Sequence, residues 1–211
     1  VTGAPMVKAS ADGKRDKLKL QQMVYEGDVI KTNRGDKAAI AFVGGAEMRI
    51  NENSEFAVES GGGSRPTSVF TKGGEAWTRL LHGKAGMNIR SPLAVAAVRG
   101  TEADIDVAAR MTVKVYEGLV DVQNQHGLQS LRAGMMTEVG GPGQAPDSPR
   151  TMSPSDFKTW QQGLTPTDID KSIERLNGVQ RPRPARHPLP RVADSRHTLR
   201  PRAGGKGDEV T

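Results

Sequence analysis

The stretch MTVKVYEGLVDVQ, residues 111–123, alternates apolar and polar side chains on either side of Gly118. Because successive side chains of a β-strand point to opposite faces of a sheet, this pattern predicts two half-buried strands joined by a turn. Similar segments recur through residues 24–139, separated by turn-forming Gly and Asn. We therefore expect an all-β fold of short strands, either a β-solenoid or a β-roll or sandwich. Recurrent glycines such as Gly27 and Gly45 favour the solenoid.

The amino-acid composition favours one fold class and excludes several kinds of catalytic and metal site. The 211 residues include 25 Gly and 13 Pro, and only 35% are hydrophobic and 4% aromatic, which favours turn-rich β structure over a helical bundle. The absence of Cys excludes disulfides, Cys-ligated zinc, iron–sulfur clusters and thiol catalysis. The four His residues lack metal-site spacing, and the Gly-rich pieces match no phosphate-binding loop. We expect no enzymatic activity and no cofactor, although a spatial Ser-His-Asp arrangement is not detectable from sequence.

The organisation changes after the β region. We expect residues 1–139 to form one β domain and residues 140–152, rich in Gly and Pro, to form a linker. Ser153 and Thr165 each start a hydroxyl–Pro–x–Asp pattern that is typical of a helix N-terminus. Residues 153–178 are therefore predicted to form two short helices, a hairpin that docks on the β domain or on a partner.

The net charge of +6 is concentrated in the Pro/Arg-rich residues 179–211. The rest of the chain is nearly neutral, which argues against a specific nucleic-acid partner. Residues 179–211 have little apolar surface to bury, so we expect a disordered basic tail. Guanidinium groups bind carboxylates and phosphates, so the tail is a candidate for contact with an acidic polymer or an anionic lipid surface. The candidate contacts are Arg181, Arg183, Arg186 and Arg191.

No apolar run approaches the roughly 18 residues of a membrane span, so we predict no transmembrane segment. The sequence starts at Val1 rather than Met, which is consistent with a signal peptide that has been removed.

The most distinctive stretch is Val98-Arg99-Gly100-Thr101, inside the longer run SPLAVAAVRGTE of residues 91–102. Together with EGDVIKT after Tyr25, GGEAW at residues 73–77 and VYEGLVDV at residues 115–122, it resembles the FecR domain family. The resemblance covers about residues 20–139. Phe157 and Trp160 resemble the aromatic pair that often follows such domains.

The resemblance implies a non-catalytic, all-β module located outside the cytoplasm, in the periplasm or secreted. In the founding group of the family, the module belongs to an anti-sigma regulator that senses a TonB-dependent iron transporter. We expect a departure from that pattern, because neither a membrane span nor a cytoplasmic anti-sigma segment is predicted within residues 1–211.

Two polar groups have a structural and a functional interpretation. Arg99, Gly100 and Thr101 are expected to form a tight corner between two apolar segments. The functional alternative is that the Arg99 guanidinium binds a ligand. Glu102, Asp104 and Asp106 could supply paired carboxylates, but their alternation with apolar residues favours the solvated face of a strand.

We therefore expect a binding or scaffold protein of the bacterial envelope with an envelope protein as its partner. A periplasmic sensor in signal transduction, regulating a TonB-dependent transporter system, is the alternative. Partner contacts are expected at the aromatic residues Trp77, Phe157 and Trp160 and at the arginines of the tail.

Overall fold

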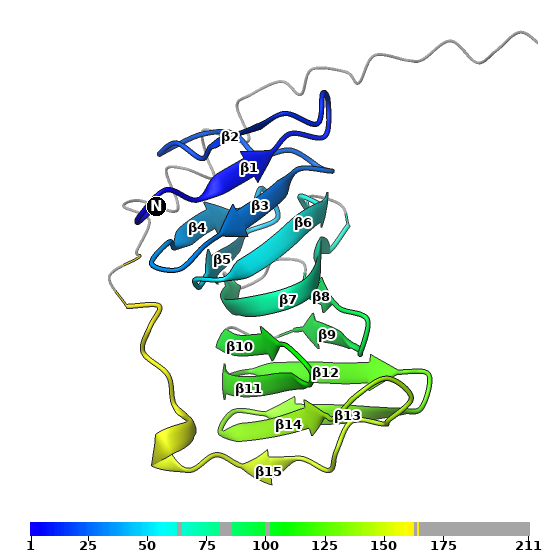
Figure 1. Ribbon diagram of the computed structural model, residues 1–211. Coiled ribbons are helices and arrows are strands. Elements are labelled where there is room, and N and C mark those ends of the chain that lie inside the picture. Colours follow the sequence, from blue (N-terminus) through cyan, green and yellow to red (C-terminus); the bar gives the residue numbers. More distant parts are fainter. Residues whose placement is uncertain (63–64, 81–85, 100–101, 163, 165–211) are drawn as a thin grey trace, which may run out of the picture. The chain divides into compact units, whose positions relative to one another are not determined.

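The computed structural model describes residues 1–62, 65–80, 86–99, 102–162 and 164 (Figure 1). These residues form an all-β structure, as predicted, with one short 3-10 turn, η1 (Pro154–Asp156). The strands are β1 (Met6–Lys8), β2 (Arg15–Lys17), β3 (Val29–Thr32), β4 (Ala38–Ala41), β5 (Ala46–Ile50), β6 (Ser54–Ser60), β7 (Thr67–Leu80), β8 (Met87–Arg90), β9 (Val95–Val98), β10 (Glu102–Val107), β11 (Met111–Glu117), β12 (Leu119–Asn124), β13 (Gly127–Arg132), β14 (Met135–Val139) and β15 (Arg150–Thr151).

The strands are linked into one open sheet with two branches that share β7. The first branch has the order β2-β1-β3-β6-β7-β8-β9-β12-β13, and the second has the order β4-β5-β7-β10-β11-β14-β15. All neighbours are antiparallel except β7 and β8. The solenoid prediction is therefore wrong. The recurrent glycines, such as Gly45 and Gly118, instead occupy positive-φ positions in short links between consecutive strands.

Strand β7 belongs to both branches because it changes its inward face halfway along. Val69 and Thr71 point into the core from its first half, whereas Ala76 and Thr78 do so from its second half. The change of parity falls at Gly73–Gly74, where the pairing with β6 is also irregular. Gly74 has φ +131°, and a Cβ there would lie 2.4 Å from the Cβ of Ser54. Only glycine fits this position without strain.

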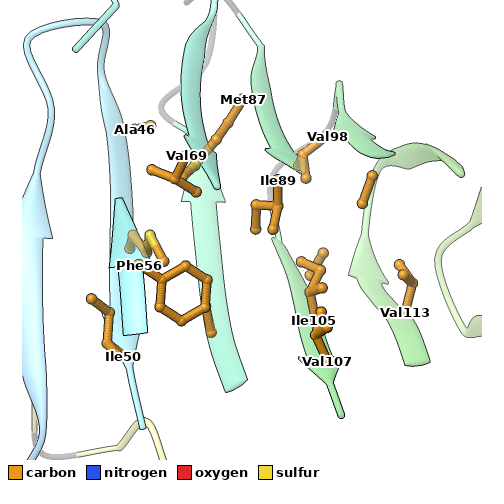
Figure 2. Packing of buried hydrophobic residues seen from close by; sticks show 14 of the residues in the cluster. Ala46, Ile50, Phe56, Val69, Met87, Ile89, Val98, Ile105, Val107 and Val113 are labelled. Carbon is orange, nitrogen blue, oxygen red and sulfur yellow. The ribbon is translucent and has the colours of Figure 1, made fainter. Parts of the chain in front are cut away.

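Both branches contribute to one hydrophobic core. Phe56, Val69 and Ile89 from the first branch and Ile50 and Ile105 from the second are almost fully buried and belong to one cluster (Figure 2). Burying each such side chain contributes roughly 1.5–3 kcal/mol, so this shared core holds the branches together.

The chain after β15 does not form the first predicted helix. Among the described residues after β15, only η1 is helical, and Phe157 already has an extended backbone with φ −74° and ψ 128°. The second predicted helix and the basic tail lie outside the described residues. We call residues 153–162 the strap. In Figure 1 the yellow chain runs back from η1 towards β4. Among the described residues, no helix has the length and hydropathy needed to cross a membrane.

Candidate functional site

The outward side of the second branch carries a set of polar side chains in cross-strand register. Arg49 lies opposite Trp77, which lies opposite Asp104, which lies opposite Lys114, on four adjacent strands. Strand alternation places further polar residues on this same side. We call this set the strap face. It comprises Glu47 and Arg49 of β5, Glu75, Trp77 and Arg79 of β7, Glu102, Asp104 and Asp106 of β10, and Lys114 and Tyr116 of β11.

The strap crosses these strands and its backbone carbonyls are bound by cations. Lys114 Nζ donates to the Asp156 carbonyl at 2.7 Å. Arg49 Nη1 donates to the Gln161 carbonyl at 2.8 Å. Lys37, beside β4, donates from Nζ to the Trp160 carbonyl at 3.0 Å. The Asp156 carbonyl is thus bound from β11, whereas those of Trp160 and Gln161 are bound from beside β4 and from β5, so the strap runs across the strands from β11 towards β5 and β4.

The strap side chains bind the strap face in return. The Lys158 ammonium forms ion pairs with the carboxylates of Glu75 and, at 3.6 Å, Asp106. The indole Nε1 of Trp160 donates to Asp104 Oδ2 at 3.1 Å, and Lys37 Nζ lies 5.5 Å from the Trp160 ring centroid. Each carboxylate on this part of the strap face therefore has a donor from the strap.

A stacked aromatic pair closes the other end of the strap. The rings of Phe157 and Tyr116 have centroids 5.6 Å apart, with an interplanar angle of 30°. The hydroxyl oxygen of Tyr116 accepts the backbone N–H of Lys158 at 3.3 Å. Phe157 remains 50% exposed, so this contact is open to solvent.

Burial perturbs the acid at the centre of the strap face. Asp104 is only 1% exposed. Loss of water, and secondly the charge of Glu75, raise the pKa of Asp104 to about 7, although Lys158, Trp160 and Lys114 act in the opposite direction. The same two causes raise the pKa of Asp106. Burial lowers the pKa of Lys158, but the hydrogen bond and charge of Glu75 outweigh it and raise the pKa overall.

A second network surrounds Trp77 beside the strap. The guanidinium groups of Arg49 and Arg79 lie 4.3 and 5.9 Å from its ring centroid. Both arginines pair with the buried Glu47, at 2.7 and 2.9 Å. The Trp77 indole donates to Glu102 at 2.7 Å. Trp77 is thus 4% exposed and held between charged groups.

The structure places the sequence-predicted residues in different environments. Trp77 and Trp160 have internal partners on the strap face, and Phe157 is half exposed. Arg99 is mostly exposed and pairs through Nε with Asp121 at 3.0 Å, on the first branch and away from the strap face. Gly100, Thr101 and the tail arginines Arg181, Arg183, Arg186 and Arg191 lie outside the described residues.

One expectation about the strap face is wrong and several of its residues were missed. Asp104 does not lie on a solvated face, because the strap covers it. Glu75, Lys114 and Lys158 were not singled out, and neither was Lys37. Their partners are distant in sequence, so no local spacing marks them. Within the described residues, no group of three or more His, Cys, Asp or Glu side chains is arranged to hold a metal ion.

Comparisons with known proteins relate this chain to one family. Residues 28–121 match the profile of the family described as FecR protein. Two crystal structures of a candidate anti-sigma factor from Parabacteroides distasonis, at 1.65 and 2.50 Å resolution, share the fold with TM-scores of 0.56 and 18% sequence identity. The alignments cover 64% and 71% of this chain and 65% and 72% of those chains, so the first spans just under two thirds of its relative.

No curated protein matches the chain in sequence. At 18% identity the two crystal structures show a shared fold. The family match begins just before β3 and ends within β12, so it includes both halves of β7 and four strands of the strap face. Residues 28–121 therefore form a FecR domain.

Proposed function

We propose that the protein is a non-catalytic regulator in envelope signal transduction, which acts outside the cytoplasm by binding another protein. The FecR domain and the fold shared with a candidate anti-sigma factor support the regulatory role. We propose, more specifically, that this regulator is a periplasmic sensor that regulates a TonB-dependent transporter system.

The observation that carries the proposal is the way the strap face holds a peptide segment, which is extended at Phe157 and turns at residues 160–162. Three cations bind main-chain carbonyls, and buried or half-buried carboxylates bind a lysine and an indole. These are contacts by which proteins recognise peptides, since they combine backbone hydrogen bonds with side-chain selection. The charged side chains of this face form ion pairs and hydrogen bonds with one another and with the strap. A surface that holds one peptide segment by such contacts is suited to bind another.

A scaffold role in the envelope is the second candidate, favoured by the seven Arg of the C-terminal tail. In this role, Arg181, Arg183, Arg186 and Arg191 would tether the protein to an acidic polymer or to anionic lipid headgroups. Deletion of residues 181–211 would then weaken binding to anionic vesicles, and binding of the intact chain would fall as salt rises.

Deletion of the gene in its host distinguishes the two roles. A regulator should change the transcript levels of a discrete gene set, and the intact gene supplied in trans should restore them. A scaffold should leave transcripts unchanged while an envelope complex is lost from co-purification. Turnover by the purified protein on an esterase, glycosidase or peptidase panel, abolished by a point change in the β domain, would overturn both roles.

A further inference from the structure

We propose that the strap face is an exchangeable docking site for a partner peptide. The strap occupies the site in the free protein, and a partner segment with a basic residue two positions before a tryptophan replaces it in the complex. This inference rests on the proposed role as a protein-binding regulator and specifies the partner's chemistry.

The backbone contacts make the site tolerant of sequence. Lys37, Arg49 and Lys114 donate to carbonyl oxygens at 2.7–3.0 Å, and every residue of a peptide supplies such an acceptor, whatever its side chain. Another peptide that runs across β11, β10, β7 and β5 could therefore use the same three donors.

The side-chain contacts supply the selectivity. Lys158 and Trp160 are two residues apart and both face the strap face, whereas Thr159 between them is exposed. Glu75 and Asp106 together bind one ammonium group, and Asp104 binds one indole N–H. A basic residue followed two positions later by Trp satisfies all three carboxylates. A partner without the basic residue would leave Glu75 and Asp106 uncompensated beside Asp104.

The strap can leave without removing part of the hydrophobic core. Among the described residues, the core cluster draws its members from residues 7–139 and contains none from the strap. The strap also follows the last strand pair, β14 with β15, so its release leaves the sheet hydrogen bonds in place. Its attachment to the same chain gives it an effective concentration on the order of millimolar, which a partner must overcome.

Binding of a synthetic peptide tests the proposal on the full chain. The probe is a fluorescein-labelled peptide with the sequence of residues 152–162, MSPSDFKTWQQ. The double variant Lys158→Ala/Trp160→Ala weakens the internal strap. We expect this variant to bind the probe about tenfold or more tightly than the wild-type chain, as measured by fluorescence anisotropy. A control peptide with Ala at both positions should not bind the variant.

The proposal is overturned if the folded double variant binds the probe no better than wild type, or binds the control peptide equally well. If the double variant does not fold, hydrogen exchange on the wild-type chain decides. Saturating probe should then increase exchange of the Lys158 amide and leave the β10 amides unchanged, and no increase would overturn the proposal. A strap-dependent dimer in light scattering would make a second copy the occupant and would also overturn it.

The two proposals can fail separately. Peptide docking is measured on the purified chain, whereas the regulatory role is measured by transcripts in the host. Probe binding with unchanged transcripts would retain the docking site and reject the regulator, and the reverse result would reject only the docking site.

Discussion

The indole N–H of Trp160 donates to the carboxylate of Asp104 across 56 residues of sequence, at 3.1 Å. This contact lies where the strap crosses β10. It provides Asp104 with a donor and holds Trp160 beside Lys37. A buried carboxylate and a covering chain segment thus depend on each other.

Replacing Trp160 by Phe should loosen the strap while leaving the core intact. The variant keeps an aromatic ring but removes the N–H that Asp104 accepts, and an unsatisfied buried acceptor costs about 1–3 kcal/mol. Hydrogen exchange of the Lys158 amide should increase, while that of β10 changes little. Equal protection of Lys158 in both proteins would show that the contact does not hold the strap.

The pH dependence of stability should carry a signature of Asp104. The pKa of this group is raised from 3.8 to about 7 by burial and Glu75, so the folded chain retains a proton that the unfolded chain has lost. Stability from this group is present at acidic pH and is lost as pH rises towards about 7. The unfolding free energy of wild type minus that of Asp104→Asn should therefore fall between about pH 4 and 7 and then stay flat.

The matched control for Asp104 is Asp36→Asn. Hydrogen bonds from the backbone N–H groups of Ala4 and Asn33 lower the pKa of Asp36. Stability from Asp36 is present above its ordinary pKa and lost as pH falls through the lowered one. Its wild-type minus variant difference should change only below about pH 4, in the opposite direction. A constant difference for Asp104→Asn between about pH 4 and 7 would contradict its raised pKa.

The strands could be predicted because their information is local. A period of two in residues 111–123 requires only that one side of each strand face a core. The pairing partners could not be predicted, because β7 changes its inward face at Gly73–Gly74 and joins two branches there. The solenoid prediction was wrong because the spacing between glycines depends only on the length of a strand and of the link that follows it. This spacing is the same whether the next strand stacks on the first, as in a solenoid, or pairs with another strand in an antiparallel sheet.

The candidate site was harder to predict for a related reason. Glu102, Asp104 and Asp106 alternate with apolar residues whether water or another chain segment covers them, so the pattern in β10 does not distinguish the two cases. The helix prediction at Ser153 had a correct local basis, since Asp156 accepts the backbone N–H of Ser153 at 2.8 Å. The contacts of Phe157, Lys158 and Trp160 with distant strands accompany an end of the helical backbone at Phe157, and the chain turns again only at residues 160–162.

Removing the charge of Glu47 should strongly destabilise the protein. This carboxylate is 1% exposed and pairs with both Arg49 and Arg79, so Glu47→Gln leaves two guanidinium groups without their anion. Breaking a buried pair from one side costs about 3–5 kcal/mol. Glu59→Gln, which removes the exposed pair with Arg90, is the control and should cost no more than about 1 kcal/mol. Equal midpoints in urea unfolding for the two variants would refute the structural role of Glu47.

A glycine pair tests the bend in β7. Gly74 and Gly35 both have positive φ, at +131° and +80°, but they differ in their surroundings. An added Cβ at Gly74 would clash with the backbone and side chain of Ser54, whereas nothing lies within 4 Å of one at Gly35. Gly35→Ala should therefore cost about 1–2 kcal/mol from backbone strain alone. Gly74→Ala should cost clearly more, about 3 kcal/mol or above, because Ser54 must also move. The comparison is made by thermal unfolding of the full chain. If Gly74→Ala is no less stable than Gly35→Ala, the close approach of β6 to β7 is not what requires glycine, and the change of inward face must have another cause.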